Sequence, residues 1–200
     1  MLVHGFRAKK KANNDHLRSV FIRVSELNKC AWLVSFNQRD TFAVVLFEVI
    51  GPASQVAIPS GVEVIDRGGA TILPGFINAH VHDAYNESRL EAWAQAGVTT
   101  VRDEGIISGS CQLTRLVALR DQWVISPQYS LMSEAGMTPM QIIVAATRNA
   151  ARVRNLEDKL GTLEAGKLAD IFIINGDPLY DLSTFTQVKM VIPGGEIIRQ

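Results

Sequence analysis

The stretch ILPGFINAHVH at residues 72–82 carries the strongest fold signal in this sequence. Its second half alternates between apolar and polar side chains, which is typical of a β-strand. A helical pattern follows at residues 87–96 and ends at Gly97, and the β-branched run VTTV follows at residues 98–101. Strand, helix and strand in this order predict a βαβ unit with two parallel strands and a right-handed connection.

Residues 137–142 read MTPMQI and are the clearest local signal of a helix start. Thr138 is an expected N-cap, Pro139 suits the first helical position, and Gln141 completes a capping box. These signals predict a helix over residues 139–153.

Shorter elements are predicted on both sides of these two regions. The expected helices cover residues 113–123 and 131–135. The expected strands cover residues 41–50, 62–65, 71–73 and 169–174, and a hairpin joins 188–192 to 196–199 around Gly194 and Gly195.

Composition limits the class of protein. Hydrophobic residues make up 47% of the 200 residues, and 20 basic residues balance 20 acidic ones, so the chain can bury a core and is not a basic nucleic-acid binder. The longest apolar run is six residues, at 42–47, far below the ~20 of a membrane-spanning helix. Two cysteines, Cys30 and Cys111, are too few for a disulfide framework. We therefore expect a cytoplasmic globular protein without nucleic-acid or membrane partners.

The amino-terminal segment is basic. Residues 1–23 contain six basic side chains and a single acid, Asp15. A nucleic-acid-binding arm is one interpretation, but no aromatic or glycine-rich pattern accompanies the charges. A solvated tail is therefore the better interpretation, and residues 1–40 are left without an assigned element.

His80 and His82 are the candidate metal ligands. Residues two apart on a strand share a face, with Cα atoms roughly 6.5–7 Å apart, so both imidazoles can reach one metal ion. A pair of core histidines is the alternative interpretation of the same spacing. Asp103 ends the next strand and either faces this site or caps the following loop. Cys111 has no histidine partner in the sequence pattern and is interpreted as an idle thiol.

Three stretches of the sequence resemble the amidohydrolase superfamily, and especially its imidazolonepropionase-like and prolidase-like members. These stretches are residues 72–103, 134–151 and 161–171, together 61 of the 200 residues. The first is similar to the opening barrel strands of that family. The other two are similar to the region where the chain leaves the barrel for a β-sandwich.

The resemblance implies a (β/α)₈ barrel with a small β-sandwich built from both chain ends. It implies a metal centre, with zinc as the first candidate for the divalent ion, that activates water to hydrolyse C–N bonds. His80 and His82 match the first two metal ligands of the family. The other family ligands are a lysine, two further histidines and an aspartate on later strands.

The chain departs from the family pattern in its middle. A complete barrel takes ~250 residues, whereas only 55 residues separate His82 from Thr138. No histidine follows His82, so two of the family ligands have no counterpart.

We therefore expect an α/β protein with an incomplete barrel fragment at residues 76–154. Residues 41–75 and 155–200 would form the small composite sandwich.

Two functions follow from the sequence. The first is a metal-dependent amidohydrolase-type enzyme acting on a small amide or dipeptide. The alternative is an inactive, truncated remnant or a module that associates with another chain, including a second copy of itself. Uncovered strand edges of a partial barrel would favour such association.

Overall fold

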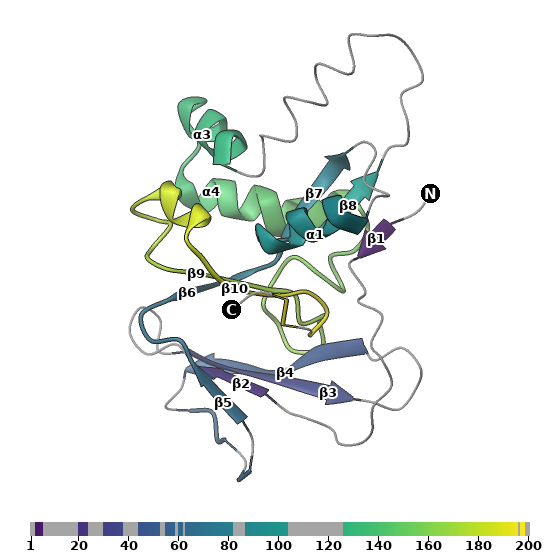
Figure 1. Cartoon of the computed structure of the whole chain (residues 1–200), viewed down its shortest axis with the longest axis vertical. Helices are drawn as coiled ribbons and strands as arrows, with labels where there is room; N and C mark the ends of the chain where they lie inside the picture. The colour runs from purple at the N-terminus through teal and green to yellow at the C-terminus, as the bar shows by residue number, and fades with distance from the viewer. Residues whose placement is uncertain are drawn as a thin grey trace.

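The computed structural model describes residues 3–5, 20–23, 30–37, 44–52, 55–58, 60–61, 63–81, 87–103, 126–195 and 197–198. The described strands form three sheets, ordered β1-β8-β7, β10-β9-β6 and β4-β3-β2-β5. Figure 1 shows the sheet of β6, β9 and β10 between the other two. No helix of the described residues is long and apolar enough to cross a membrane. The fold is therefore mixed α/β, as expected.

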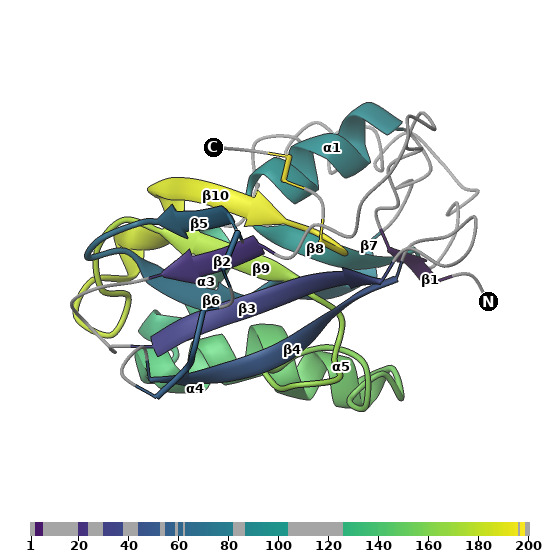
Figure 2. The ribbon, with the colours of Figure 1, turned by 90° about the horizontal axis from the view of Figure 1, so that it is seen from below.

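The predicted βαβ unit is confirmed. It consists of β7 (Phe76–Val81), α1 (Glu87–Gln95) and β8 (Val98–Asp103). The two strands are parallel, and β1 (Val3–Gly5) pairs antiparallel with the other edge of β8. Figures 1 and 2 show α1 on one face of this layer and helices α4 and α5 on the opposite face.

Gly97 makes the tight return from α1 into β8 possible. Its φ is +91°, in the left-handed region that favours glycine. A Cβ at this position would lie 2.5 Å from the ring of Phe172. The sequence expectation that Gly97 ends the helix is confirmed, and the close contact with a strand of the next sheet is an additional reason for glycine.

The central sheet consists of β6 (Thr71–Pro74), β9 (Ile171–Ile174) and β10 (Val188–Ile192), all antiparallel to their neighbours. All four β9 side chains are completely buried because both faces of this strand are covered. Phe172 and Ile174 belong to the core cluster under β7 and β8. Ile171 and Ile173 belong to the cluster shared with β4.

The third sheet contains β2 (Val20–Arg23), β3 (Cys30–Asn37), β4 (Val44–Pro52) and β5 (Glu63–Asp66). The sequence predicts no element in residues 1–40, yet β1, β2 and β3 lie there. Distant partners explain this in part, because β1 pairs with β8 and β2 pairs in parallel with β5. β4 corresponds to the strand expected at 41–50, and it buries alternate residues, Val45 and Phe47, rather than its whole length.

The helix start predicted at Thr138 is confirmed. The helix before it, α3 (Ser126–Glu134), is followed by Gly136 at a φ of +90°. In α4 (Pro139–Val144) the Thr138 side chain accepts from the Gln141 N–H, and the Gln141 side chain accepts from the Thr138 N–H, so the capping box is confirmed. The helix then continues as the π-helix η1 (Ala145–Asn149) and α5 (Ala150–Val153). The sequence did not predict this change of winding.

The hairpin predicted around Gly194 and Gly195 is wrong in its second half. β10 pairs with β9, and residues 197–198 form no strand, although the Ile198 N–H donates to the Val191 carbonyl. A short 3₁₀ helix, η2 (Leu182–Thr186), precedes β10.

Asp170 joins three of these elements just before β9. Its carboxylate accepts from the Gly194 N–H at 2.6 Å and from the Thr99 hydroxyl at 3.1 Å. Its main-chain carbonyl accepts from the Gly75 N–H at 2.9 Å. The turn after β10, the strand β8 and the start of β7 are therefore held by one residue.

We expect this junction to weaken as pH rises. Burial raises the pKa of Asp170 from 3.8 to about 6, against the opposing effect of its two hydrogen bonds. Because the folded state binds this proton more tightly, its stabilising contribution is complete at low pH and is lost as pH rises through about 6. The loss should be on the order of 2 kcal/mol.

The variant Asp170→Asn isolates this effect. Between pH 4.5 and 7.5, its free energy of unfolding in urea titrations should rise relative to the original protein. Parallel pH profiles for the two proteins would contradict the expectation.

Candidate functional site

His80 lies exposed near the carboxyl end of β7, the end at which α/β folds build their sites. The register between β7 and β8 shifts between Asn78 and Val81, so His80 sits in a local bulge. Its N–H donates to the Asn78 side-chain oxygen at 3.2 Å. Bulges of this kind change the direction of side chains next to functional sites. The sequence predicted the strand and the histidine, but not the bulge.

Asp103 ends β8 at the same edge of the sheet. It is buried and lies opposite Val81 in the register. The parallel pairing therefore brings His80 and Asp103 to neighbouring strand ends. This position is compatible with the predicted role of Asp103 at the site. His82, Asp83 and Cys111 lie outside the described residues, as does the expected helix at 113–123.

The metal-ligand set is incomplete among the described residues. No group of three or more His, Cys, Asp or Glu side chains comes together in this part of the chain. Catalytic zinc usually has three protein ligands and a water molecule. The described residues alone therefore do not fit a complete catalytic zinc centre.

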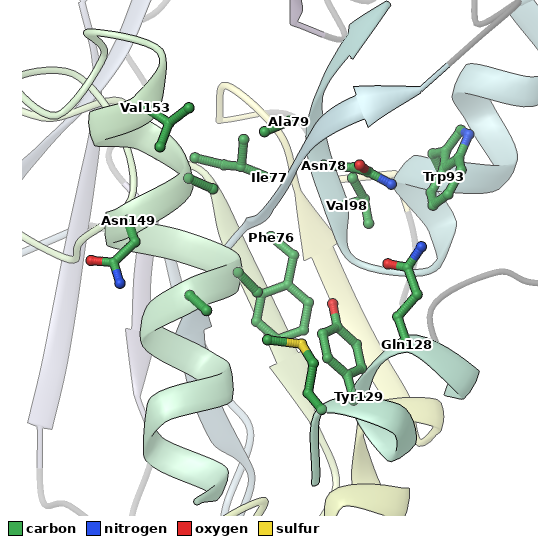
Figure 3. Close-up of a pocket in the computed structure, with 14 residues that line it drawn as sticks. Phe76, Ile77, Asn78, Ala79, Trp93, Val98, Gln128, Tyr129, Asn149 and Val153 are labelled. Atoms are coloured by element: carbon green, nitrogen blue, oxygen red, sulfur yellow. The ribbon is translucent and has the colours of Figure 1, made fainter. Parts of the chain in front are cut away.

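A pocket of about 320 Å³ lies beside β7, and the sequence analysis did not predict it. Its walls come from β7, α1, the start of β8, α3 and the helical run from η1 into α5. Figure 3 shows Asn78, Gln128 and Trp93 on one side of Phe76 and Tyr129, with Asn149 and Val153 across from them. The π-helix contributes three lining residues, and π-helical turns are frequent at functional sites.

The floor of the pocket is an aromatic cluster. The Phe76 ring centroid lies 5.3 Å from that of Tyr129, and the Tyr129 centroid lies 4.9 Å from that of Phe185. Phe76 also contacts Phe172 with an edge-on geometry at 5.1 Å. Burial raises the pKa of Tyr129 well above its ordinary value of 10, so its hydroxyl stays protonated.

Comparisons with known proteins agree with the sequence resemblance. The model of the Amidohydrolase family matches residues 103–198. An imidazolonepropionase of Streptococcus sanguinis (strain SK36) is 29% identical over 137 residues, which are 64% of this chain and 30% of that protein. An imidazolonepropionase of Aromatoleum aromaticum (strain DSM 19018 / LMG 30748 / EbN1) is 39% identical over 64 residues, which are 30% of this chain and 16% of that protein.

Solved structures show the same fold at low sequence identity. A Xaa-Pro dipeptidase with bound methionine in its active site aligns with a TM-score of 0.65 and 12% identity, over 91% of this chain and 100% of the other. An amidohydrolase of Thermotoga maritima MSB8 aligns with a TM-score of 0.63 and 12% identity, over 90% of this chain and 100% of the other.

These comparisons support a relationship to the amidohydrolase superfamily, whose family model matches residues 103–198 of this chain. It spans about 30% of the length of the streptococcal imidazolonepropionase that it matches.

Proposed function

We propose that this chain is the metal-anchoring part of an amidohydrolase-type enzyme that hydrolyses C–N bonds of small amides or dipeptides. In this proposal His80 and His82 bind a divalent metal, with zinc as the first candidate. Residues 76–154 form the partial barrel, and residues 41–75 and 155–200 form the composite β-sandwich, which β2 and β3 extend. The proposal includes a cytoplasmic location.

The observation that carries the proposal is the position of His80 in the bulge at the end of β7. A bulge at a strand end can re-aim a side chain toward a ligand shared with a neighbouring residue. Exposed imidazole is the commonest protein metal ligand, and His82 follows at the spacing that permits convergence. The imidazolonepropionases and the dipeptidase among the similar proteins support a C–N bond as the target.

Hydrolysis itself needs ligands beyond this pair. The described residues contain no group of three possible ligands, and the sequence has no histidine after His82. We therefore propose that the complete site forms only when another chain, or a second copy, supplies further ligands. This requirement also supports the alternative function, an inactive remnant or association module. The number of ligands in the working assembly separates the two functions.

Imidazole NMR tests the metal-anchoring role. The chain has four histidines, His4, His16, His80 and His82, so each ring can be followed separately. On addition of Zn²⁺ we expect the resonances of His80 and His82 to shift together, because one ion contacts both rings. The double variant His80→Ala/His82→Ala should abolish the response, whereas His16→Ala should leave it unchanged. Unchanged His80 and His82 resonances at saturating Zn²⁺ would contradict the proposal.

A further inference from the structure

The hydroxyl of Tyr129 is the unexplained polar group of the pocket beside β7. Tyr129 is 7% exposed and lines the pocket, and no hydrogen bond from its hydroxyl to another described residue is found. The hydroxyl is not among the fully buried atoms without a partner, so a molecule in the pocket can reach it. Figure 3 shows this hydroxyl directed into the pocket, on the side where the amides of Asn78 and Gln128 lie. A ligand group that accepts a hydrogen bond would satisfy it.

The other lining side chains define what such a ligand can be. None of the pocket residues carries a charge, and most are aromatic or aliphatic. An ionised ligand would lose its hydration here without an opposite charge to replace it. The rings of Phe76, Tyr129 and Trp93 favour a flat, apolar ring, because aromatic groups pack edge-on or offset against each other.

We propose that this pocket binds an uncharged aromatic compound whose carbonyl oxygen accepts a hydrogen bond from Tyr129. The amide of Gln128 lies at the rim and can bind a polar substituent beside that carbonyl. The volume of about 320 Å³ lies at the lower end of the range for small-molecule sites and fits a single substituted ring. The lining residue Asn78 accepts a hydrogen bond from the His80 N–H, and binding in the pocket does not depend on a bound metal.

Three ring compounds of similar size test the proposal. Benzamide is neutral and has a carbonyl, benzoate adds a negative charge, and toluene lacks the polar group. Binding to the full chain is followed by saturation-transfer NMR. We expect benzamide to bind with a Kd on the order of 1 mM, as for other ligands of this size. Benzoate should bind at least about 10-fold more weakly. Absence of saturable benzamide binding, or equal binding of benzoate, would overturn the proposal.

The variant Tyr129→Phe removes only the hydroxyl. It should weaken benzamide about 5-fold, the typical effect of one hydrogen bond, and leave toluene unchanged. Tyr180→Phe is the matched control, since Tyr180 is 90% exposed and outside the pocket, and it should change neither. Equal benzamide affinity in the original protein and Tyr129→Phe would overturn the assignment of this hydroxyl.

A second variant, which fills the pocket, tests the location of the binding site independently of Tyr129→Phe. Ala146 lines the pocket from the π-helix, whereas Ala92 is exposed on α1. Ala146→Leu should weaken both benzamide and toluene by at least about 10-fold, because it occupies their volume. Ala92→Leu adds the same side chain elsewhere and should have no effect. Unchanged binding in Ala146→Leu would overturn the location of the site.

Discussion

The isolated chain should hydrolyse N-acyl amino acids, Xaa-Pro dipeptides and cyclic ureides no faster than the buffer alone. General acid–base catalysis by a positioned group contributes ~10²–10⁴-fold, and no residue of the described part of the chain has been assigned this role. The lowered pKa of metal-bound water would also be lost if a third ligand is missing. Together these deficits should bring the rate to background.

A substrate panel with added Zn²⁺ or Mn²⁺ measures this directly. The double variant His80→Ala/His82→Ala is the control, because it removes both candidate ligands and keeps the rest of the chain. Turnover by the original chain that disappears in the double variant would contradict the expectation. It would show that a working site assembles from this chain alone, within one molecule or between copies.

Truncation of Phe172 should cause a large loss of folding stability, and we expect this core position to be the most sensitive. Its side chain is completely buried between β9 and the βαβ unit, where it contacts Phe76 and lies against Gly97. Phe172→Ala removes these contacts and leaves a cavity, which typically costs about 3–5 kcal/mol. That is a large part of the stability of an ordinary domain.

Urea unfolding of Phe172→Ala should therefore show a much lower midpoint or an unfolded protein. Leu131→Ala is the matched truncation, because Leu131 is 53% exposed on α3, and its stability should change by less than about 0.5 kcal/mol. If Phe172→Ala were as stable as Leu131→Ala, the described packing between the two sheets would be wrong.

The elements that were predictable from sequence depend on neighbouring residues. The capping box of Thr138 and Gln141 is complete within four residues, and it forms as predicted. The alternation that leads to His80 also has a local cause, since side chains of a strand point to opposite faces. Gly97 is recognisable in the sequence because it closes a helical pattern. The structure gives it the positive φ that is typical of that position.

The features that could not be predicted depend on distant partners. β2 is bounded on one side by β3 and on the other by β5, more than 40 residues away. No local pattern in a short segment reveals that partner. The π-helix also carries no composition signal, since residues 145–149 continue an ordinary helical pattern.

The candidate site also has some features with a local cause and others that depend on distant residues. The sequence predicted His80 from its strand spacing, but the bulge that contains it arises from the register with β8. The role of Asp103 was left open, and only the pairing with Val81 shows which strand end it shares. The pocket combines residues from five parts of the chain, so no motif in the sequence could indicate it.

Metal stoichiometry tests the central claim most directly. The claim is that His80 and His82 are the amidohydrolase-like metal ligands of this chain, and that a working site needs further ligands. Elemental analysis after purification and dialysis should find Zn²⁺ well below one per chain, because two imidazoles bind it weakly without further ligands. One or two tightly held metal ions per chain would contradict the claim and show that this chain completes the site by itself.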